Sequence, residues 1–180
     1  VEEILRIAKG DKNKKILDMC TGSGAIAISL KKLGGFERVD AVDISNDALE
    51  IAKKNAVGLG CDINFSKSDM FSGLTSENKY DIIVSNPPYI KSHMVDSLES
   101  EVKDFEPRLA LDGDIDGMKF YKIIKENFIK HLNPEGILAL EIGYDEAKDI
   151  RKLFDGFDIN IKKDLSNLDR VAIISEKIYI

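Results

Sequence analysis

The segment Asp18-Met19-Cys20-Thr21-Gly22-Ser23-Gly24-Ala25 joins a short apolar run, Ile16 to Met19, to a stretch of helical period, Ala25 to Leu33. Glycines in such a strand-to-helix loop let the backbone turn tightly and bring a ligand close to the free N–H groups at the helix start. The helix dipole favours a carboxylate or phosphate at that place. The segment therefore predicts a ligand-binding loop, formed by Asp18, Cys20, Thr21, Gly22 and Gly24.

The rest of the chain alternates in the same way between apolar, β-rich runs and runs of helical period. Further strands are predicted at Val39 to Val42, Ile63 to Ser66, Tyr80 to Ser85, Ile137 to Ile142, Phe157 to Lys162 and Val171 to Ser175. Further helices are predicted at Ala48 to Leu59, Met118 to Leu132 and Asp145 to Phe154, the second stopped by a turn at Asn133, Pro134 and Gly136. This alternation is typical of an α/β, Rossmann-like fold with a mostly parallel sheet wound on both faces.

The last two predicted strands are separated by only eight residues. A crossover between parallel strands needs a dozen or more residues, so these two strands are expected to pair antiparallel. In a parallel sheet of this kind, ligands bind at the carboxyl ends of the strands, near the switch in strand order. The predicted loop at Gly22 lies at such an end.

Bulk composition limits the classes of protein that remain. The chain has 180 residues, 43% of them hydrophobic and 32% charged, which suits one soluble domain spanning 1–180. No apolar run approaches the ~18 residues of a membrane span. The cysteines Cys20 and Cys61 and the histidines His93 and His131 are isolated, so we expect no metal, and a reducing cytoplasm. The net charge of −6 argues against nucleic-acid binding through the whole surface, although a local basic groove stays open.

The loop alone does not separate two kinds of cofactor. Gly22-x-Gly24-x-x-Ala27 also fits the dinucleotide fingerprint. Asp18, however, precedes the glycines, where its carboxylate would repel a pyrophosphate but could meet the ammonium of an amino-acid moiety directly or through water. This placement favours S-adenosylmethionine. Chain reversal without a ligand remains the alternative for Gly22 and Gly24.

Two later acids extend the predicted cofactor site. Asp43 ends the second strand, 19 residues after Gly24, where a carboxylate accepts hydrogen bonds from ribose hydroxyls. Asn46 and Asp47 look better placed to cap the next helix, which leaves Asp43 for a ligand, together with its neighbour Ile44. Asp69 is predicted to accept the adenine amino group while Met70 covers the ring, although Asp69 could also be a simple turn acid.

Asn86-Pro87-Pro88-Tyr89 directly follows the apolar strand Tyr80 to Ser85. The two prolines fix φ and remove two N–H donors, which makes the loop stiff and rich in free carbonyls. The Asn86 side-chain oxygen and the Pro87 carbonyl can each accept one hydrogen bond from an NH2 group, and Tyr89 offers a flat face to a planar group. We predict that Asn86, Pro87 and Tyr89 are catalytic and that Asn86 also borders the cofactor. A rigid turn without function is the alternative.

These residues resemble the class I methyltransferases and, among them, the release-factor glutamine methyltransferases of the HemK type. Asp18 to Gly24, Asp43 and Asn86 to Tyr89 match the family's cofactor loop, ribose acid and NPPY motif. Later segments also match: Glu106-Pro107-x-x-Ala110-Leu111, Asp116-Gly117, Glu141-Ile142-Gly143, Asp164 and Asp169-Arg170. NPPY itself also occurs in adenine and other amino methyltransferases, so a nucleic-acid methyltransferase and a dinucleotide-binding module stay as alternatives.

The resemblance implies a seven-stranded sheet with an antiparallel last strand. It also implies methyl transfer from S-adenosylmethionine to the side-chain nitrogen (N5) of the glutamine in a Gly-Gly-Gln loop of peptide chain release factors. A separate N-terminal recognition domain belongs to this picture, and we expect it to be missing here, where the chain begins at Val1. We further expect a monomer that makes no direct contact with nucleic acid.

Two positions depart from the family pattern. Cys20 stands where a glycine is usual, so the loop is expected to be less permissive, with a buried rather than a reactive thiol. Asn167 replaces a glycine before the last strand, a milder change because asparagine tolerates positive φ.

The segment from Met94 to Asp116 carries eight acids and two bases, a balance of −6 that equals the formal net charge of the whole chain. The acids are Asp96, Glu99, Glu101, Asp104, Glu106, Asp112, Asp114 and Asp116, and the bases are Lys103 and Arg108. Beside the substrate edge of the sheet, this charge would repel nucleic-acid phosphates and suit a neutral or basic peptide. A solvated acidic loop without a selective role is the alternative.

Overall fold

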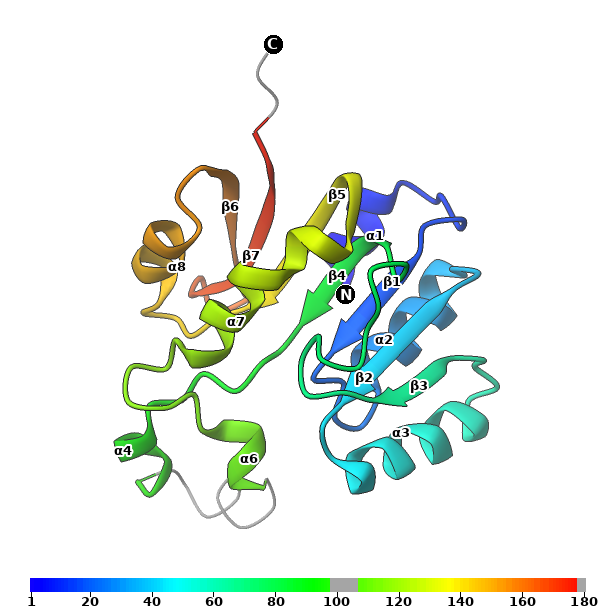
Figure 1. Cartoon of the computed structure of the whole chain (residues 1–180), viewed down its shortest axis with the longest axis horizontal. Coiled ribbons are helices and arrows are strands. Elements are labelled where there is room, and N and C mark those ends of the chain that lie inside the picture. Colours follow the sequence, from blue (N-terminus) through cyan, green and yellow to red (C-terminus); the bar gives the residue numbers. More distant parts are fainter. Residues whose placement is uncertain (98–106, 178–180) are drawn as a thin grey trace. The chain divides into compact units, whose positions relative to one another are not determined.

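The computed structural model describes residues 1–97 and 107–177, and its strands form a seven-stranded sheet of order β3-β2-β1-β4-β5-β7-β6 (Figure 1). The strands are β1 (Ile16–Met19), β2 (Val39–Asp43), β3 (Asn64–Lys67), β4 (Tyr80–Ser85), β5 (Leu132–Glu141), β6 (Phe157–Lys163) and β7 (Asp169–Glu176). β1 pairs parallel with β2 and β4, β2 pairs parallel with β3, and β6 pairs antiparallel with β7. The predicted α/β fold with an antiparallel last strand is thereby confirmed.

Helices connect most of these strands. They are α1 (Glu2–Ala8), α2 (Ala25–Ser29), the π-helix η1 (Leu30–Gly34), α3 (Asn46–Gly58), α4 (Ser92–Val95), α6 (Arg108–Leu111), α7 (Lys119–Asn127), the 3-10 helix η2 (Phe128–His131) and α8 (Ala147–Leu153). The predicted helix Ala25 to Leu33 is formed by α2 and its π-helical continuation. In the described part of the chain, no helix is both long and apolar enough to cross a membrane.

The cap of α3 differs from the expectation. Ser45, not Asn46 or Asp47, is the N-cap, and its Oγ accepts a hydrogen bond from the Ala48 N–H at 3.2 Å. A serine hydroxyl in this position satisfies one of the N–H groups that have no partner within the helix. The correction leaves Asp43 outside the cap, as predicted.

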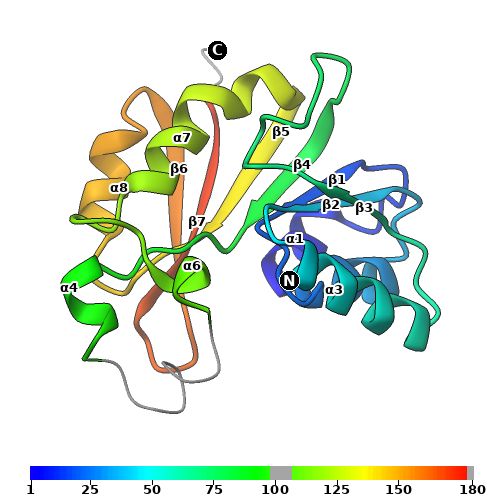
Figure 2. The ribbon, with the colours of Figure 1, turned by 60° about the horizontal axis from the view of Figure 1, so that its bottom comes forward.

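The chain divides into two compact units: Val1–Ser85 with Asn127–Ala139, and Asn86–Glu126 with Leu140–Ile180. In the first unit, α1, α2 and α3 lie on one face of β1, β2 and β3 (Figure 2). All four residues of β1 are buried, which fits a central strand covered on both faces. This burial, shared by five of the six residues of β4, explains why β1 and β4 lie at the residues that their mostly apolar runs predict.

In the second unit, β6 and β7 form a hairpin, and α8 packs against β7. The hairpin turn contains Asn167 at φ 64. The Asp164 carboxylate accepts hydrogen bonds from the N–H groups of Ser166 at 2.9 Å and Leu168 at 3.0 Å, which holds the turn. The expectation that asparagine can replace a glycine here is confirmed, because Asn167 does adopt positive φ.

The start of β5 was predicted wrongly. The expected strand begins at Ile137 after a turn, whereas β5 runs from Leu132, and the preceding α-helix ends at Asn127 before the single turn η2. Pro134 is compatible with the beginning of a strand, where a missing N–H costs little. Glu135 adopts φ 60, so the expected change of backbone direction occurs within β5 and does not precede it.

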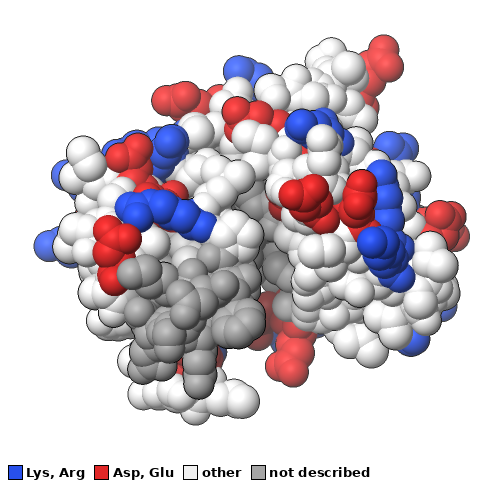
Figure 3. Space-filling model, turned by 90° about the horizontal axis from the view of Figure 1, so that it is seen from below, with Lys and Arg blue, Asp and Glu red and all other residues white. Residues whose placement is uncertain are grey.

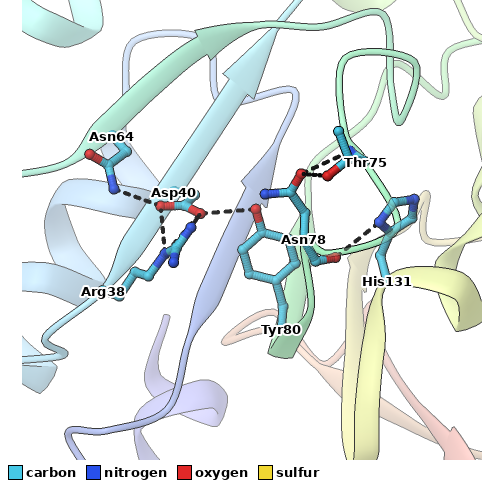
Figure 4. A network of polar contacts seen from close by, with 7 residues as sticks. All are labelled: Arg38, Asp40, Asn64, Thr75, Asn78, Tyr80 and His131. Carbon is cyan, nitrogen blue, oxygen red and sulfur yellow. Dashed lines mark hydrogen bonds and ion pairs between the residues drawn. The ribbon is translucent and has the colours of Figure 1, made fainter.

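A polar network closes the other end of β2, away from the predicted ligand edge (Figure 4). Asp40 is only 7% exposed, and its carboxylate accepts hydrogen bonds from Arg38, Asn64 and Tyr80, each at 2.9 Å. Burial of Asp40 works to raise its pKa, but these hydrogen bonds outweigh burial and hold the pKa below its ordinary value. The network therefore belongs to the fold.

The neighbouring His131 is also structural. Its Nδ1 lies 3.0 Å from the Asn78 carbonyl oxygen, and Phe71 stacks on its ring with the ring centroids 5.2 Å apart. Asn78 in turn accepts hydrogen bonds from the backbone and side chain of Thr75 (Figure 4). The buried His131 ring therefore serves packing and one hydrogen bond within the fold.

We predict that Tyr80→Phe destabilises the protein by about 1–3 kcal/mol at pH 7, because it removes a buried donor to a carboxylate. The depressed pKa of Asp40 means that its stabilisation is present above the unfolded-state pKa near 4 and is lost as the pH falls. The effect of Tyr80→Phe should therefore shrink at pH 3. Urea unfolding at both pH values measures it, with Tyr144→Phe as the control, because Tyr144 is 62% exposed. Equal effects of the two substitutions at pH 7 would contradict this role.

Candidate functional site

The glycine loop after β1 is organised by Asp18, which is fully buried. Its Oδ2 accepts hydrogen bonds from the Thr21 hydroxyl at 2.6 Å and the Ala27 N–H at 3.0 Å, so one carboxylate oxygen ties the loop to the first turn of α2. Its Oδ1 is also buried and has no hydrogen-bond partner among the described residues. Burial raises the pKa of Asp18 to about 7, against the hydrogen bonds from Thr21 and Ala27.

Three residues of the loop adopt left-handed backbone conformations: Cys20 at φ 58, Gly22 at φ 54 and Gly24 at φ 82. A Cβ on Gly24 would lie 3.0 Å from the Ala52 Cβ, so glycine is needed there for close packing against α3. A Cβ on Gly22 would meet nothing within 4 Å, which leaves open space above this residue. Cys20, in contrast, holds a conformation that favours glycine, which agrees with the expectation of a less permissive loop.

The Cys20 thiol faces Met70, with Sγ 3.6 Å from the Met70 Sδ. Cys20 is half-buried, so the expectation of a buried thiol holds only in part, but desolvation and the charge of Asp43 raise the pKa of Cys20 to about 12, and the thiol stays protonated at neutral pH. Met70 is 6% exposed, and its φ of 50 places it in a tight turn. The Met70 carbonyl accepts a hydrogen bond from the Ser68 hydroxyl at 2.6 Å. The structure thus brings Met70 to the glycine loop, 50 residues after Cys20.

Asp43 is bound to the same loop. Its Oδ2 accepts the Gly22 N–H at 2.9 Å, and its Oδ1 accepts the Ser45 N–H at 2.9 Å. Each carboxylate oxygen can accept a second hydrogen bond, so a pair of ribose hydroxyls still fits. The predicted neighbours Ile44 and Asp69 are both exposed, which leaves their side chains available to a ligand.

These residues fit S-adenosylmethionine on three observations. Asp18 has a buried oxygen without a partner among the described residues, which suits an ammonium bound through water. Open space lies above Gly22. Asp43 is anchored and keeps free acceptor capacity. Direct contact with a ligand is restricted for Asp18 by its complete burial and for Thr21 by its burial and its hydrogen bond to Asp18, so Gly22 is better placed to touch a ligand.

The segment Asn86 to Tyr89 combines an exposed side chain with a fixed backbone. Asn86 is exposed, whereas Pro87 and Pro88 are buried. Within the described residues, neither the Asn86 side chain nor the Pro87 carbonyl has a hydrogen-bond partner. Both predicted acceptors are therefore free, and Asn86 does not turn into the core. Asn86 directly follows Ser85, the last residue of β4. Ser85 lies opposite Met19 in the parallel pairing of β4 with β1, and its hydroxyl donates a hydrogen bond to the Met19 carbonyl at 2.8 Å.

Tyr89 is half-buried in the second unit, and the charges of Glu141 and Arg170 both act on its hydroxyl. Burial and the charge of Glu141 raise the pKa of Tyr89, while Arg170 opposes the shift, so the phenol stays protonated at neutral pH. Arg170 is held in turn by Asp164, with the Nε 3.2 Å from Oδ2. Glu141 and Arg170 lie in segments that match the family pattern, but their residue types alone assigned them no role.

Glu146 is a further residue that sequence reasoning missed. It is 4% exposed, and its Oε2 accepts hydrogen bonds from the Gly143 N–H at 2.8 Å and the Tyr121 hydroxyl at 3.2 Å. Burial raises the pKa of Glu146, and these two hydrogen bonds oppose the shift. An acid at the start of a short helix looks like an ordinary surface residue in the sequence, so no pattern could have identified it.

The structure describes only part of the acidic segment from Met94 to Asp116. Glu99, Glu101, Lys103, Asp104 and Glu106 lie outside the described residues. The four described acids are all paired with cations: Asp96 and Asp112 with Arg108, Asp114 with Lys119 and Asp116 with Lys122. Lys119 and Lys122 follow the counted segment, so its charge surplus is smaller in space than in sequence. On the face that Figure 3 shows, the described cations are likewise mixed with acids.

Comparison with known proteins gives both close relatives and a shared fold. The chain is 38% identical over 179 residues to the release factor glutamine methyltransferase of Clostridium acetobutylicum, covering 96% of this chain and 63% of that relative. It is 37% identical over 174 residues to the enzyme of the same name from Koribacter versatilis, covering 96% of this chain and 62% of that one. The chain therefore spans less than two thirds of these relatives.

A solved structure, the ribosomal protein L11 methylase of Lactobacillus delbrueckii subsp. bulgaricus, superposes with a TM-score of 0.66 at 23% identity. The superposition covers 97% of this chain and 78% of that chain and shows a shared fold. The family model described as "Methyltransferase small domain" matches residues 3–115, which is more than half of the chain. The match to this family model shows that the chain belongs to the methyltransferase small domain family.

Proposed function

We propose that this chain transfers a methyl group from S-adenosylmethionine to the side-chain amide nitrogen of a glutamine in a peptide chain release factor. Residues 1–180 are its catalytic domain in this proposal. The close relatives that carry this activity in their names align with 96% of the chain, which supports the proposal. The proposal also places the chain in the cytoplasm, as a monomer that acts on protein and makes no direct contact with nucleic acid.

The observation that carries the proposal is the pair of oxygen acceptors at Asn86 and Pro87, neither of which has a hydrogen-bond partner among the described residues. An amide NH2 has two protons, and two acceptors on a stiff loop can bind both at once. Pro87 and Pro88 are buried, so the loop cannot easily move away when the substrate arrives. Tyr89 is half-buried, and its ring offers a flat face against which the planar amide can rest.

An amide nitrogen is a weak nucleophile because its lone pair is delocalised into the carbonyl. When bound, S-adenosylmethionine supplies an electrophilic methyl group. Asn86 and Pro87 orient the two N–H bonds, which directs the lone pair towards that methyl group and polarises the nitrogen. The proton that the nitrogen must release can pass to solvent, because Asn86 is exposed. In this proposal Gly22, Asp43, Asp69 and Met70 hold the cofactor, Asp18 acts on it through water, and Cys20, Thr21, Gly24, Ile44 and Asn86 border it.

Transfer of labelled methyl from S-adenosylmethionine tests the function directly. We expect label on a release factor, located by mass spectrometry at the glutamine of its Gly-Gly-Gln loop, and none on a release factor whose glutamine is replaced by glutamate. Adenine-containing oligonucleotides should stay unlabelled. Label on the oligonucleotides but not on the protein would favour the nucleic-acid methyltransferase. Binding of NAD but not of S-adenosylhomocysteine in calorimetry would favour the dinucleotide-binding module.

The Asn86→Ala variant separates substrate contact from cofactor binding. We expect turnover to fall by about 100-fold or more, because one of two fixed acceptors is lost. The affinity for S-adenosylhomocysteine should change by less than about 1 kcal/mol, measured by calorimetry. Asn160→Ala is the control, because Asn160 is an exposed asparagine on β6. A loss of cofactor binding and turnover together in Asn86→Ala alone would show that Asn86 is structural.

A further inference from the structure

Two glycines pack directly against the backbone of Tyr89. A Cβ on Gly113 would lie 2.7 Å from the Tyr89 Cα, and a Cβ on Gly117 would lie 2.5 Å from the Tyr89 carbonyl oxygen. Both distances are shorter than real Cβ contacts, so only glycine allows the two backbones to approach this closely. Hydrogen bonds from the Gly113 N–H to the Ile90 carbonyl at 2.8 Å and from the Ile90 N–H to the Leu111 carbonyl at 2.9 Å join the same segments.

Glu146 lies on the other side of Gly117. A Cβ added to Gly117 would also lie 2.8 Å from the Glu146 Oε1. Gly117 therefore fills the space between the Tyr89 carbonyl and the Glu146 carboxylate. Gly117 also adopts φ 75, a conformation that other residues rarely hold. Gly117 has little freedom to move unless Glu146 moves too.

Glu146 is itself fixed by its partners. The Gly143 N–H donates to Oε2 at 2.8 Å, and a Cβ on Gly143 would come within 3.0 Å of the Glu146 Cδ. The Tyr121 hydroxyl lies 3.2 Å from the same Oε2 and 2.9 Å from the Glu141 carbonyl oxygen. A buried carboxylate is costly unless it is hydrogen-bonded, and hydrophobic residues would fill the space at a lower cost. Its presence here calls for a role in positioning.

We propose that Glu146 is a positioning residue for the Asn86 to Tyr89 loop. The Gly143 N–H and the Tyr121 hydroxyl hold the Glu146 side chain, which packs against Gly117. Gly117 in turn packs against the backbone of Tyr89 and fixes its position. The effect of Glu146 on catalysis rests on the proposed function, because displacement of Tyr89 and Pro87 by about 1 Å misaligns the amide. Glu146 is not expected to touch the substrate or the cofactor.

The first test compares Glu146→Ala, which removes the support, with Glu146→Gln, which has nearly the same shape and keeps an oxygen acceptor for the Gly143 N–H. We expect Glu146→Ala to lower kcat for release-factor methylation by about 100-fold, as misplacement by about 1 Å can. Glu146→Gln should stay within about 3-fold of the wild type, and both variants should keep the wild-type affinity for S-adenosylhomocysteine. Ile150→Val, at a fully buried position of the same helix α8, is the control for general loosening.

The second test reads the position of the loop without any activity. Amide hydrogen exchange of Ile90 and Gly113, whose N–H groups bond across the two segments, should be about 10-fold faster in Glu146→Ala. It should be unchanged in Glu146→Gln and Ile150→Val. If Glu146→Ala does not fold, Glu146→Asp, which withdraws the carboxylate by one methylene, takes its place in both tests.

The outcomes separate this inference from the proposed function. Unchanged amide exchange and unchanged kcat in Glu146→Ala would overturn the positioning role. Losses of kcat in Glu146→Gln and Ile150→Val as large as the loss in Glu146→Ala would overturn it as well. The proposed function would be overturned if the wild-type chain methylates no release factor, even where amide exchange differs between the wild type and Glu146→Ala as expected. In that case, the exchange data would still decide whether Glu146 supports the loop.

Discussion

The buried carboxylate of Asp18 is the constraint on which the cofactor loop depends. One oxygen binds the Thr21 hydroxyl and the Ala27 N–H, so the end of β1, the glycine turn and the start of α2 are fixed relative to one another. The Asp43 carboxylate accepts a further hydrogen bond of the loop, from the Gly22 N–H. Two acids thus hold the turn from within and fix the backbone at Gly22, above which the space is open.

The main features of this arrangement could be predicted from the sequence. β1 and β4 lie at the predicted residues, because mostly apolar runs are typical of strands buried on both faces. The short connection between β6 and β7 indicated their antiparallel pairing. The loop residues Asp18, Cys20, Thr21, Gly22 and Asp43 do come together, because the carboxyl ends of parallel strands share one edge of the sheet.

Other features could not be predicted, because they depend on contacts between distant residues. Asp18 is more deeply buried than a residue that faces a ligand, which only its neighbours in space determine. The charge of the acidic segment is reduced by Lys119 and Lys122, which lie beyond it in the sequence. The support of Tyr89 by Gly117 and Glu146 joins three separate parts of the chain and leaves no local pattern.

The central claim is that two fixed oxygen acceptors bind the amide NH2 group of glutamine. A crystal structure of the chain with S-adenosylhomocysteine and a Gly-Gly-Gln peptide tests it most directly. The account predicts that the glutamine nitrogen lies within about 3 Å of both the Asn86 Oδ1 and the Pro87 carbonyl oxygen, with the ribose hydroxyls on Asp43. A glutamine nitrogen that contacts neither oxygen, or an Asn86 side chain directed away from the peptide, would contradict the account.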